Sequence, residues 1–303
     1  MKKLAITITA FIVLVVAAGY TALNLVPGFV VSTSQSIVAL SAGLDRKSVD
    51  IDGYIVNYYE GGAGEAVVLL HGMADDKNSF AATSGELTEK YRVILPDLNG
   101  HGENARDPSR DYSIAGHVAL LEKFVTKIGL EKFALGGNSM GGHISAAYTL
   151  ENPGQITKLI LVNAPGLKFD DHVVYGGFGD KMETRNDFFK MMERVVHTSP
   201  SIPGPIVDHM VAEINENFDF INGLAVAVKA GKDFDLKDRI AQIMVPTLIL
   251  WGENDQVVKF NVAEAYDQLL SNSKLRIIKE AGHSPQLEKP QLIGQEISNF
   301  LEQ

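Results

Sequence analysis

Short apolar runs alternate with longer amphipathic stretches from Val49 onward, and this alternation is the strongest constraint on the fold of the chain. The runs are rich in β-branched and large aliphatic residues, as expected for strands covered on both faces of a sheet. They fall at 54–59, 66–70, 92–95, 133–135, 158–162, 246–251 and 275–278. The stretches near 79–90, 113–129, 140–152, 261–271 and 289–302 predict helices. Strands that alternate with helices predict a doubly wound, mostly parallel α/β sheet.

The alternation breaks between Val162 and Pro246, where no buried strand is evident. This segment instead contains an apolar-rich helical stretch, Asp187–Val196, and a proline-rich stretch, Ser199–Pro205. Because so long a connection is rarely a simple loop in a compact domain, we predict a helical cap over one edge of the sheet. The predicted divisions are an N-terminal segment (1–46), the first part of the core (47–165), the cap (166–240) and the second part of the core (241–303).

The N-terminal segment is uncharged from Leu4 to Leu44 and follows two lysines, Lys2 and Lys3. Leu4–Leu23 is about as long as one helical crossing of a bilayer at ~1.5 Å per residue. The paired lysines predict that the N-terminus lies inside and the remainder of the chain outside. We therefore expect a single-pass transmembrane helix that acts as an uncleaved signal anchor.

Two further interpretations of this segment stay open. Cleavage after the small residues Val16-Ala17-Ala18 would make the segment a signal peptide and leave a secreted or periplasmic protein. The later part of the run, Asn24–Leu44, is interrupted by Pro27 and Gly28 and does not predict a second crossing. We expect it to lie along the membrane interface or to pack on the main domain.

Composition excludes several classes of function. The chain has 303 residues and a net charge of −10, which gives no electrostatic case for binding nucleic acid, since that needs clusters of basic residues to meet the phosphates. It contains no cysteine, which removes disulfides, thiolate metal sites and cysteine nucleophiles. The histidines show no ligand-like clustering, so we expect no metal and no cofactor, and no pattern predicts a protein partner.

A candidate nucleophile lies in Gly137-Asn138-Ser139-Met140-Gly141, which follows one predicted strand and precedes a predicted helix. A sharp strand-to-helix turn holds a serine in a strained, exposed conformation, and the flanking glycines leave room for the crowded backbone. Out of context the same pattern is as easily a glycine-rich turn that caps a helix. Its position between a strand and a helix favours Ser139 as the nucleophile.

Two partners for this serine follow in the order that the pattern requires, a carboxylate and then a histidine. Asp255 comes directly after the predicted strand 246–251, and His283 comes after the last predicted strand. Serine needs an imidazole to take its proton, and the imidazole needs a carboxylate to hold its tautomer. Glu253 is the rival for the carboxylate role. Asn163, at the position where some hydrolases carry the acid, cannot supply a negative charge.

A fourth element closes the predicted strand 66–70 as His71-Gly72-Met73. We assign two backbone N–H groups, those of Met73 and Met140, to stabilise a developing oxyanion. We expect the His71 side chain to brace its loop, with no acid–base role, and we expect the same of His101. We interpret His143, one turn into the predicted helix after the serine, as a packing or pocket-wall residue.

With these motifs the chain resembles the α/β-hydrolase superfamily over roughly Val49 to Leu301. It is most similar to family V bacterial lipases and membrane-bound monoacylglycerol lipases. The matching stretches begin at His71, Asp97, Gly136, Asn163, Trp251 and Gly282. The resemblance implies an eight-stranded sheet, a cap after the sixth strand, and hydrolysis of fatty-acid esters without a metal or an organic cofactor.

The resemblance also bears on the substrate. The membrane-bound relatives imply a lipid or small ester substrate, and the predicted cap is rich in large apolar residues. We expect Phe188, Phe189 and Met192 to line an acyl pocket, although each of them is as easily a packing residue of the cap. The motif around Ser139 is shared with meta-cleavage-product hydrolases, which split carbon–carbon bonds. Those enzymes often have an aromatic residue after the histidine, where this chain has Ser284-Pro285, and this difference favours an esterase.

Overall fold

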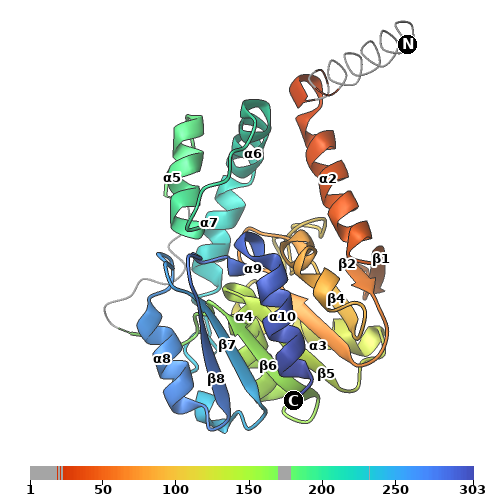
Figure 1. Ribbon diagram of the computed structural model, residues 1–303, viewed down its shortest axis with the longest axis vertical. Helices are drawn as coiled ribbons and strands as arrows, with labels where there is room; N and C mark the ends of the chain where they lie inside the picture. Colours follow the sequence, from red (N-terminus) through yellow and green to blue (C-terminus); the bar gives the residue numbers. More distant parts are fainter. Residues whose placement is uncertain (1–18, 20, 22, 170–178, 232) are drawn as a thin grey trace, which may run out of the picture.

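The computed structural model describes residues 19, 21, 23–169, 179–231 and 233–303, and its centre is an eight-stranded sheet. The strands follow the order β1-β2-β4-β3-β5-β6-β7-β8 (Figure 1). Their bounds are Leu44–Ile51 (β1), Tyr54–Gly61 (β2), Ala66–Leu70 (β3), Arg92–Pro96 (β4), Phe133–Asn138 (β5), Ile156–Val162 (β6), Thr247–Gly252 (β7) and Ser273–Ile278 (β8). β2 runs antiparallel to its neighbours β1 and β4, whereas the pairs from β4 to β8 are parallel. The predicted mostly parallel sheet is confirmed.

Two apolar clusters cover the two faces of this sheet. One packs against α3 (Ile114–Lys127), α4 (Met140–Glu151) and α8 (Phe260–Leu269), which the sequence predicted within a few residues. The other packs against α10 (Pro290–Leu301) and the segment before β4. That segment is not the predicted helix over 79–90. It forms two short 3₁₀ turns, η1 (Lys77–Phe80) and η2 (Thr83–Glu86), and η2 lies against α10.

The connection between β6 and β7 forms a helical cap. Its helices are α5 (Arg185–Val195), α6 (Gly204–Glu216) and α7 (Phe218–Ala227), and the 3₁₀ turn η3 (Ile240–Gln242) returns the chain to the sheet. Figure 1 shows α5, α6 and α7 together at one end of the sheet. Met182, Phe188 and Val207 form a separate apolar cluster within the cap. The segment is thus helical and has its own small core.

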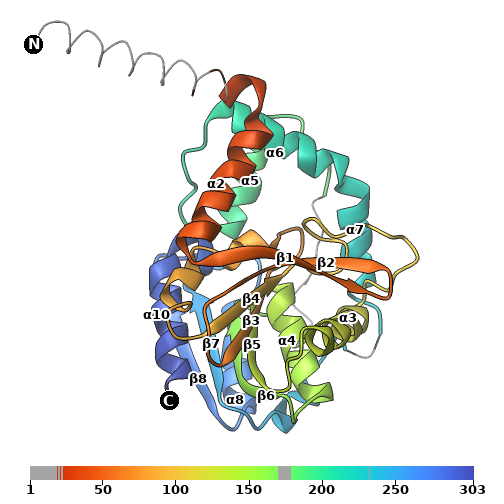
Figure 2. The ribbon, with the colours of Figure 1, turned by 90° about the vertical axis from the view of Figure 1, so that its right-hand side faces the viewer.

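The sequence did not predict β1, and an additional helix precedes it. α2 (Pro27–Ser41) buries Ala39 near its end, and Gly28 near its start lies against His209 of α6. Several of its apolar side chains stay exposed, with Phe29 at 67% and Leu40 at 73%. Figure 2 shows α2 beside α6 and reaching β1 at its end. β1 begins before residue 46, so the strand crosses the first predicted division of the chain.

The predicted transmembrane helix over Leu4–Leu23 lies outside the described residues apart from 19, 21 and 23. Within the part of the chain that the structure describes, no helix combines the length and the apolar character that a membrane crossing needs. α2 itself has only 15 residues. The membrane-spanning segment therefore stays a prediction.

Candidate active site

Ser139 lies at the junction between β5 and α4, in a strained backbone conformation. Its φ of 52° and ψ of −121° fall in a region that non-glycine residues rarely adopt. The Ser139 N–H donates to the carbonyl of Val162 in β6 at 2.9 Å, which fixes the turn against the next strand. A side chain on Gly137 or Gly141 would collide with the backbone of β3, so both positions require glycine. This is the strand-to-helix turn that the sequence predicted.

Asp255 and His283 lie together, as the sequence predicted. Asp255 follows β7 and His283 follows β8, and the distance from His283 Nδ1 to Asp255 Oδ2 is 2.9 Å. Both side chains are buried, with 7% of the histidine and 2% of the carboxylate exposed. The rival carboxylate, Glu253, instead accepts a hydrogen bond from the backbone N–H of Glu280 at 3.4 Å. Of the two acids, Asp255 is the one that contacts the histidine.

The surroundings of Asp255 favour its charged form. Burial alone would raise the pKa of Asp255, but attraction to His283 and hydrogen bonds from His283, Asn163 and the Val258 N–H together lower it. The second carboxylate oxygen accepts the backbone N–H groups of Val257 at 2.7 Å and Val258 at 3.0 Å. The carboxylate is therefore held as an anion against the imidazole.

Asn163 is a part of this arrangement that the sequence interpretation missed. Its side-chain amide donates to Asp255 Oδ2 at 2.7 Å, and its Oδ1 accepts the Gly252 N–H at 3.2 Å. Asn163 was considered only as a possible acid and was set aside for lack of charge. In the structure, Asn163 binds the carboxylate of Asp255, which follows the neighbouring strand β7, and so fixes the position of that carboxylate.

Asn138 brings the serine turn and the histidine loop together. Its side-chain amide donates to the carbonyl of His283 at 2.9 Å, and a weaker bond reaches the Val162 carbonyl at 3.3 Å. Since Asn138 directly precedes Ser139, this bond ties the residue before the serine to the backbone of His283. Asn138, within the Gly137–Gly141 motif, thus holds the serine turn next to the loop of His283.

The loop after β3 runs directly beside Ser139. A side-chain carbon on Gly72 would lie 3.4 Å from Cβ of Ser139, so the backbone passes close to the serine one residue before Met73. Met140 is fully buried as the first residue of α4. Both predicted oxyanion donors therefore belong to backbone segments that meet at Ser139. The next residue in the loop, Ala74, has a φ of 61° and adds strain.

His71 braces this loop, as the sequence predicted. Its Nδ1 lies 2.8 Å from the carbonyl of Gly72, and its Nε2 accepts the Leu98 N–H at 3.0 Å. Because Nε2 accepts a hydrogen bond, Nδ1 carries the proton and donates a hydrogen bond to the Gly72 carbonyl. The ring thereby fastens the loop after β3 to the loop after β4.

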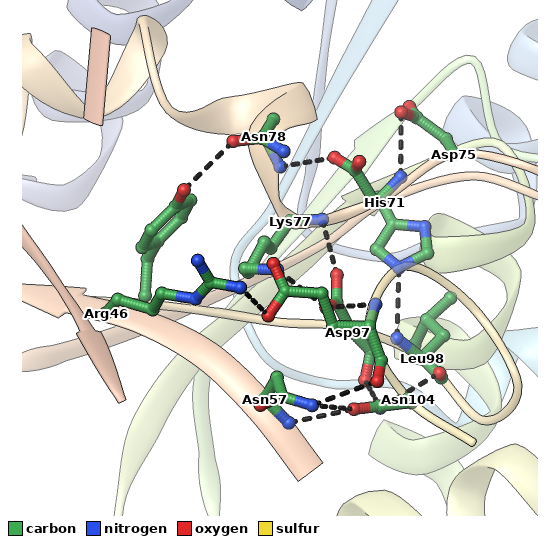
Figure 3. A network of polar contacts seen from close by, with 12 residues as sticks. Arg46, Asn57, His71, Asp75, Lys77, Asn78, Asp97, Leu98 and Asn104 are labelled. Atoms are coloured by element: carbon green, nitrogen blue, oxygen red, sulfur yellow. Dashed lines mark hydrogen bonds and ion pairs between the residues drawn. The ribbon is translucent and has the colours of Figure 1, made fainter. Parts of the chain in front are cut away.

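A network of charges, buried at Lys77 and Asp97 and open to solvent at Arg46, supports the loop after β3 (Figure 3). Lys77 Nζ lies 2.8 Å from Asp97 and 3.0 Å from Glu103, and its side chain is only 1% exposed. The backbone N–H of Lys77 donates to the other oxygen of Asp97 at 2.8 Å, so the side chain and the backbone of Lys77 both bind the Asp97 carboxylate. Glu103 also pairs with Arg46 of β1. The network ties the start of η1, a few residues beyond Met73, to the first half of β1 and to the end of β4.

Two more histidines are buried near these elements. Burial lowers the pKa of His117 to about 3 and the pKa of His143 to about 4. His143 Nε2 lies 2.8 Å from the carbonyl of Asp233, which fastens α4 to the end of the cap. Their burial and lowered pKa values agree with structural roles. Among the described residues, no group of three or more His, Asp and Glu side chains is placed to hold a metal.

The three predicted substrate-binding residues all lie on α5. Phe188 is fully buried in the core of the cap, and its ring meets that of Phe189 edge to face at 5.6 Å. Phe189 and Met192 are partly buried and pack against that core. Phe188 thus contributes to the packing of the cap, whereas the other two side chains keep exposed surface. Their contact with an acyl chain stays a prediction.

These features define a serine-centred site at the strand ends of an α/β sheet, and the chain belongs to the alpha/beta hydrolase fold family, whose sequence model matches residues 65–198 and 212–290. Among curated relatives, Lipase 1 of Psychrobacter immobilis is 28% identical over 271 residues, covering 85% of each chain. A monoacylglycerol lipase, abhd6-A of Xenopus laevis, is 28% identical over 252 residues, covering 78% of this chain and 75% of its own. A crystal structure of a membrane phospholipase A from a bacterium superposes with a TM-score of 0.85 at 27% identity, covering 100% of this chain and 98% of the other.

Proposed function

We propose that this protein is a serine hydrolase that cleaves carboxylic esters of fatty acids through an acyl-enzyme on Ser139. The observation that carries the proposal is the 2.9 Å hydrogen bond between His283 and the buried Asp255, in a loop that Asn138 fastens beside the serine turn. In this proposal Ser139, His283 and Asp255 are the nucleophile, the base and the orienting acid.

The proposed reaction has two halves. Ser139 Oγ attacks the ester carbonyl carbon while His283 Nε2 takes its proton, and the Met73 and Met140 N–H groups stabilise the oxyanion. The imidazolium returns the proton to the leaving alcohol as the carbon–oxygen bond breaks. A water molecule, deprotonated by His283, then attacks the acyl-enzyme, and the fatty acid leaves as the proton returns to Ser139. Asp255 remains charged throughout and orients the ring.

The substrate class rests on the relatives and on the cap. The curated relatives reported above are named as lipases, and the superposed structure is named as a membrane phospholipase. Phe189 and Met192 offer partly buried apolar surface to an acyl chain. The alternative is a carbon–carbon bond hydrolase of the meta-cleavage-product type. Ser284-Pro285 after the histidine and the names of these relatives favour the ester.

We also propose that the segment Leu4–Leu23 anchors the protein in a membrane as a single crossing, with the catalytic domain on the exported side. Its support is the uncharged run after Lys2 and Lys3, together with the exposed apolar side chains of α2 that follow it. A protein held in this way would retain membrane association after a carbonate wash. A mature chain that begins near Gly19 would instead indicate a cleaved signal peptide.

The catalytic proposal is tested by three substitutions and two substrate classes. Ser139→Ala should lower kcat on p-nitrophenyl esters by on the order of 10⁴-fold, and Asp255→Asn should be nearly as damaging. Glu253→Gln is the matched control and should keep almost full activity. Full activity in Ser139→Ala, or turnover of a diketone acid in preference to every ester from C2 to C16, would refute the proposal.

A further inference from the structure

The loop of His283 is joined to the segment that follows cap helix α5 through one carboxylate, that of Glu288. Its Oε1 accepts the backbone N–H of Gly282 at 2.6 Å, one residue before the histidine. Its Oε2 accepts the backbone N–H of His197 at 2.7 Å and a weaker bond from Thr198 at 3.4 Å. The two oxygens of one side chain thus bind two segments that lie far apart in the sequence.

These two segments also touch directly. The Ser284 N–H donates to the carbonyl of Val195, the last residue of α5, at 3.1 Å. A side-chain carbon on Gly282 would lie 2.7 Å from the His197 backbone nitrogen, so no larger residue fits there. The histidine loop therefore rests against the end of α5, the helix that carries Phe189 and Met192. Any shift of that helix acts on the residues on both sides of His283.

The short helix α9 (Pro285–Glu288) also reaches η1 and η2, the two 3₁₀ turns that follow the loop of Met73. The Gln286 side-chain amide donates to Ser79 Oγ at 3.1 Å, and the Thr83 hydroxyl donates to the Gln286 carbonyl at 3.2 Å. One turn of helix thus contacts the segment beyond Met73, while its last residue, Glu288, contacts the cap. Within α9, Glu288 makes the charge-assisted hydrogen bonds, since its carboxylate accepts backbone N–H groups at both oxygens.

We infer that Glu288 is a positioning residue, whose carboxylate fixes the loop of His283 against the end of cap helix α5. It touches neither substrate nor the reacting atoms and acts through the placement of the imidazole. A displacement of a catalytic group by about 1 Å can reduce a rate by about 100-fold. The inference rests on the proposed function, because it assumes that His283 activates Ser139.

The test measures the reactivity of Ser139 toward a fluorophosphonate, which phosphonylates an activated serine without using the acyl pocket of the cap. The rate constant of labelling reports how well His283 is placed, whereas its amplitude reports the folded fraction. A purely structural role would lower the amplitude and leave the rate constant unchanged. Glu288→Gln replaces one acceptor oxygen with an amide donor, which must then face a backbone N–H.

We expect Glu288→Gln to slow labelling by 10- to 100-fold with at least half of the wild-type amplitude. The matched control is Glu280→Gln, which removes a carboxylate from the same loop. The Glu280 side chain is 79% exposed, and its carboxylate lies 3.5 Å from Lys289 Nζ. This control should label at the wild-type rate. A second variant, His197→Pro, deletes the N–H on the cap side and keeps Glu288. Val196 before it is extended, with ψ of 149°, which proline tolerates.

The outcomes separate the inference from the proposal beneath it. If wild-type protein is labelled at Ser139 and Glu288→Gln labels equally fast, the inference is overturned and the proposed function stands. If Glu288→Gln is slow but His197→Pro labels at the wild-type rate, the link to the cap is refuted. If the wild-type protein is not labelled at all, the proposed function fails and the inference falls with it.

Discussion

The buried ion pair between Lys77 and Asp97 allows a quantitative prediction. At an effective dielectric constant of 20, the attraction across the observed 2.8 Å is about 6 kcal/mol before desolvation is subtracted. Lys77→Met would leave the carboxylate of Asp97, which is 0% exposed, with two backbone N–H groups as its partners. An uncompensated buried charge of this kind costs about 3–5 kcal/mol, so we expect that loss in the free energy of unfolding.

The assay is urea-induced unfolding at pH 7, with the slope of each transition compared between variants. The double variant Lys77→Met/Asp97→Asn removes both charges, and its loss should be smaller than the sum of the two single losses by at least about 2 kcal/mol. Lys123→Met is the control. Its partner Asp52 is also at 2.8 Å, but the two side chains are 61% and 77% exposed, so solvent screens the pair and the cost should be far smaller than that of Lys77→Met. If Lys77→Met costs no more than this control, the reasoning is refuted.

Three further predictions concern the site and its surroundings. Asn163→Ala removes the 2.7 Å hydrogen bond to Asp255 and should lower kcat by about 5- to 30-fold with little change in KM; an unchanged kcat would contradict this role. Because burial lowers the pKa of His143 from 6.5 to about 4, the unfolded chain takes up a proton in this interval that the folded chain does not. The free energy of unfolding should therefore fall by about 3 kcal/mol from this residue as the pH drops from 6.5 to 4, and His143→Gln should show a smaller fall in urea titrations at both pH values. Each methylene buried against Phe189 should raise kcat/KM about three- to fourfold, since it contributes ~0.8 kcal/mol, and Phe189→Ala should flatten the dependence on ester chain length. Identical chain-length profiles in the two proteins would show that Phe189 only packs the cap.

Local sequence patterns were sufficient to predict most of the sheet. The parallel strands β3, β5 and β7 are buried on both faces, so their sequences are continuous apolar runs that differ clearly from the helices between them. β1 was missed because it is an edge strand, with Asp45, Arg46 and Lys47 exposed in its first half. The segment 79–90 has an amphipathic pattern, but it turns twice as 3₁₀ helix against α10. Packing against α10, which the local pattern does not report, therefore accompanies 3₁₀ turns in place of the expected α-helix.

The two groups of site residues differed in how far the sequence could predict them. Ser139, Asp255 and His283 follow strand ends in a characteristic order, so their positions could be predicted from local motifs. Asn163 and Glu288 carry no such signal. Asn163 meets Asp255 across 92 residues of sequence and Glu288 meets His197 across 91, and these partners become visible only once the sheet is assembled. The one sequence signal was that both residues lie in stretches that resemble the α/β-hydrolase family, those that begin at Asn163 and at Gly282.

The position of α9 near the end of the chain has a consequence for the nascent protein. Its bonds to Ser79 and Thr83 close loops of 207 and 203 residues, and 145 residues separate Asn138 from His283. At a synthesis rate of roughly 5–20 residues per second, the serine turn leaves the ribosome about 7–30 s before the histidine. Under the proposed mechanism, the chain has during that interval a nucleophile without a base. Ester cleavage by this mechanism therefore cannot begin until His283 has emerged and packed beside Ser139.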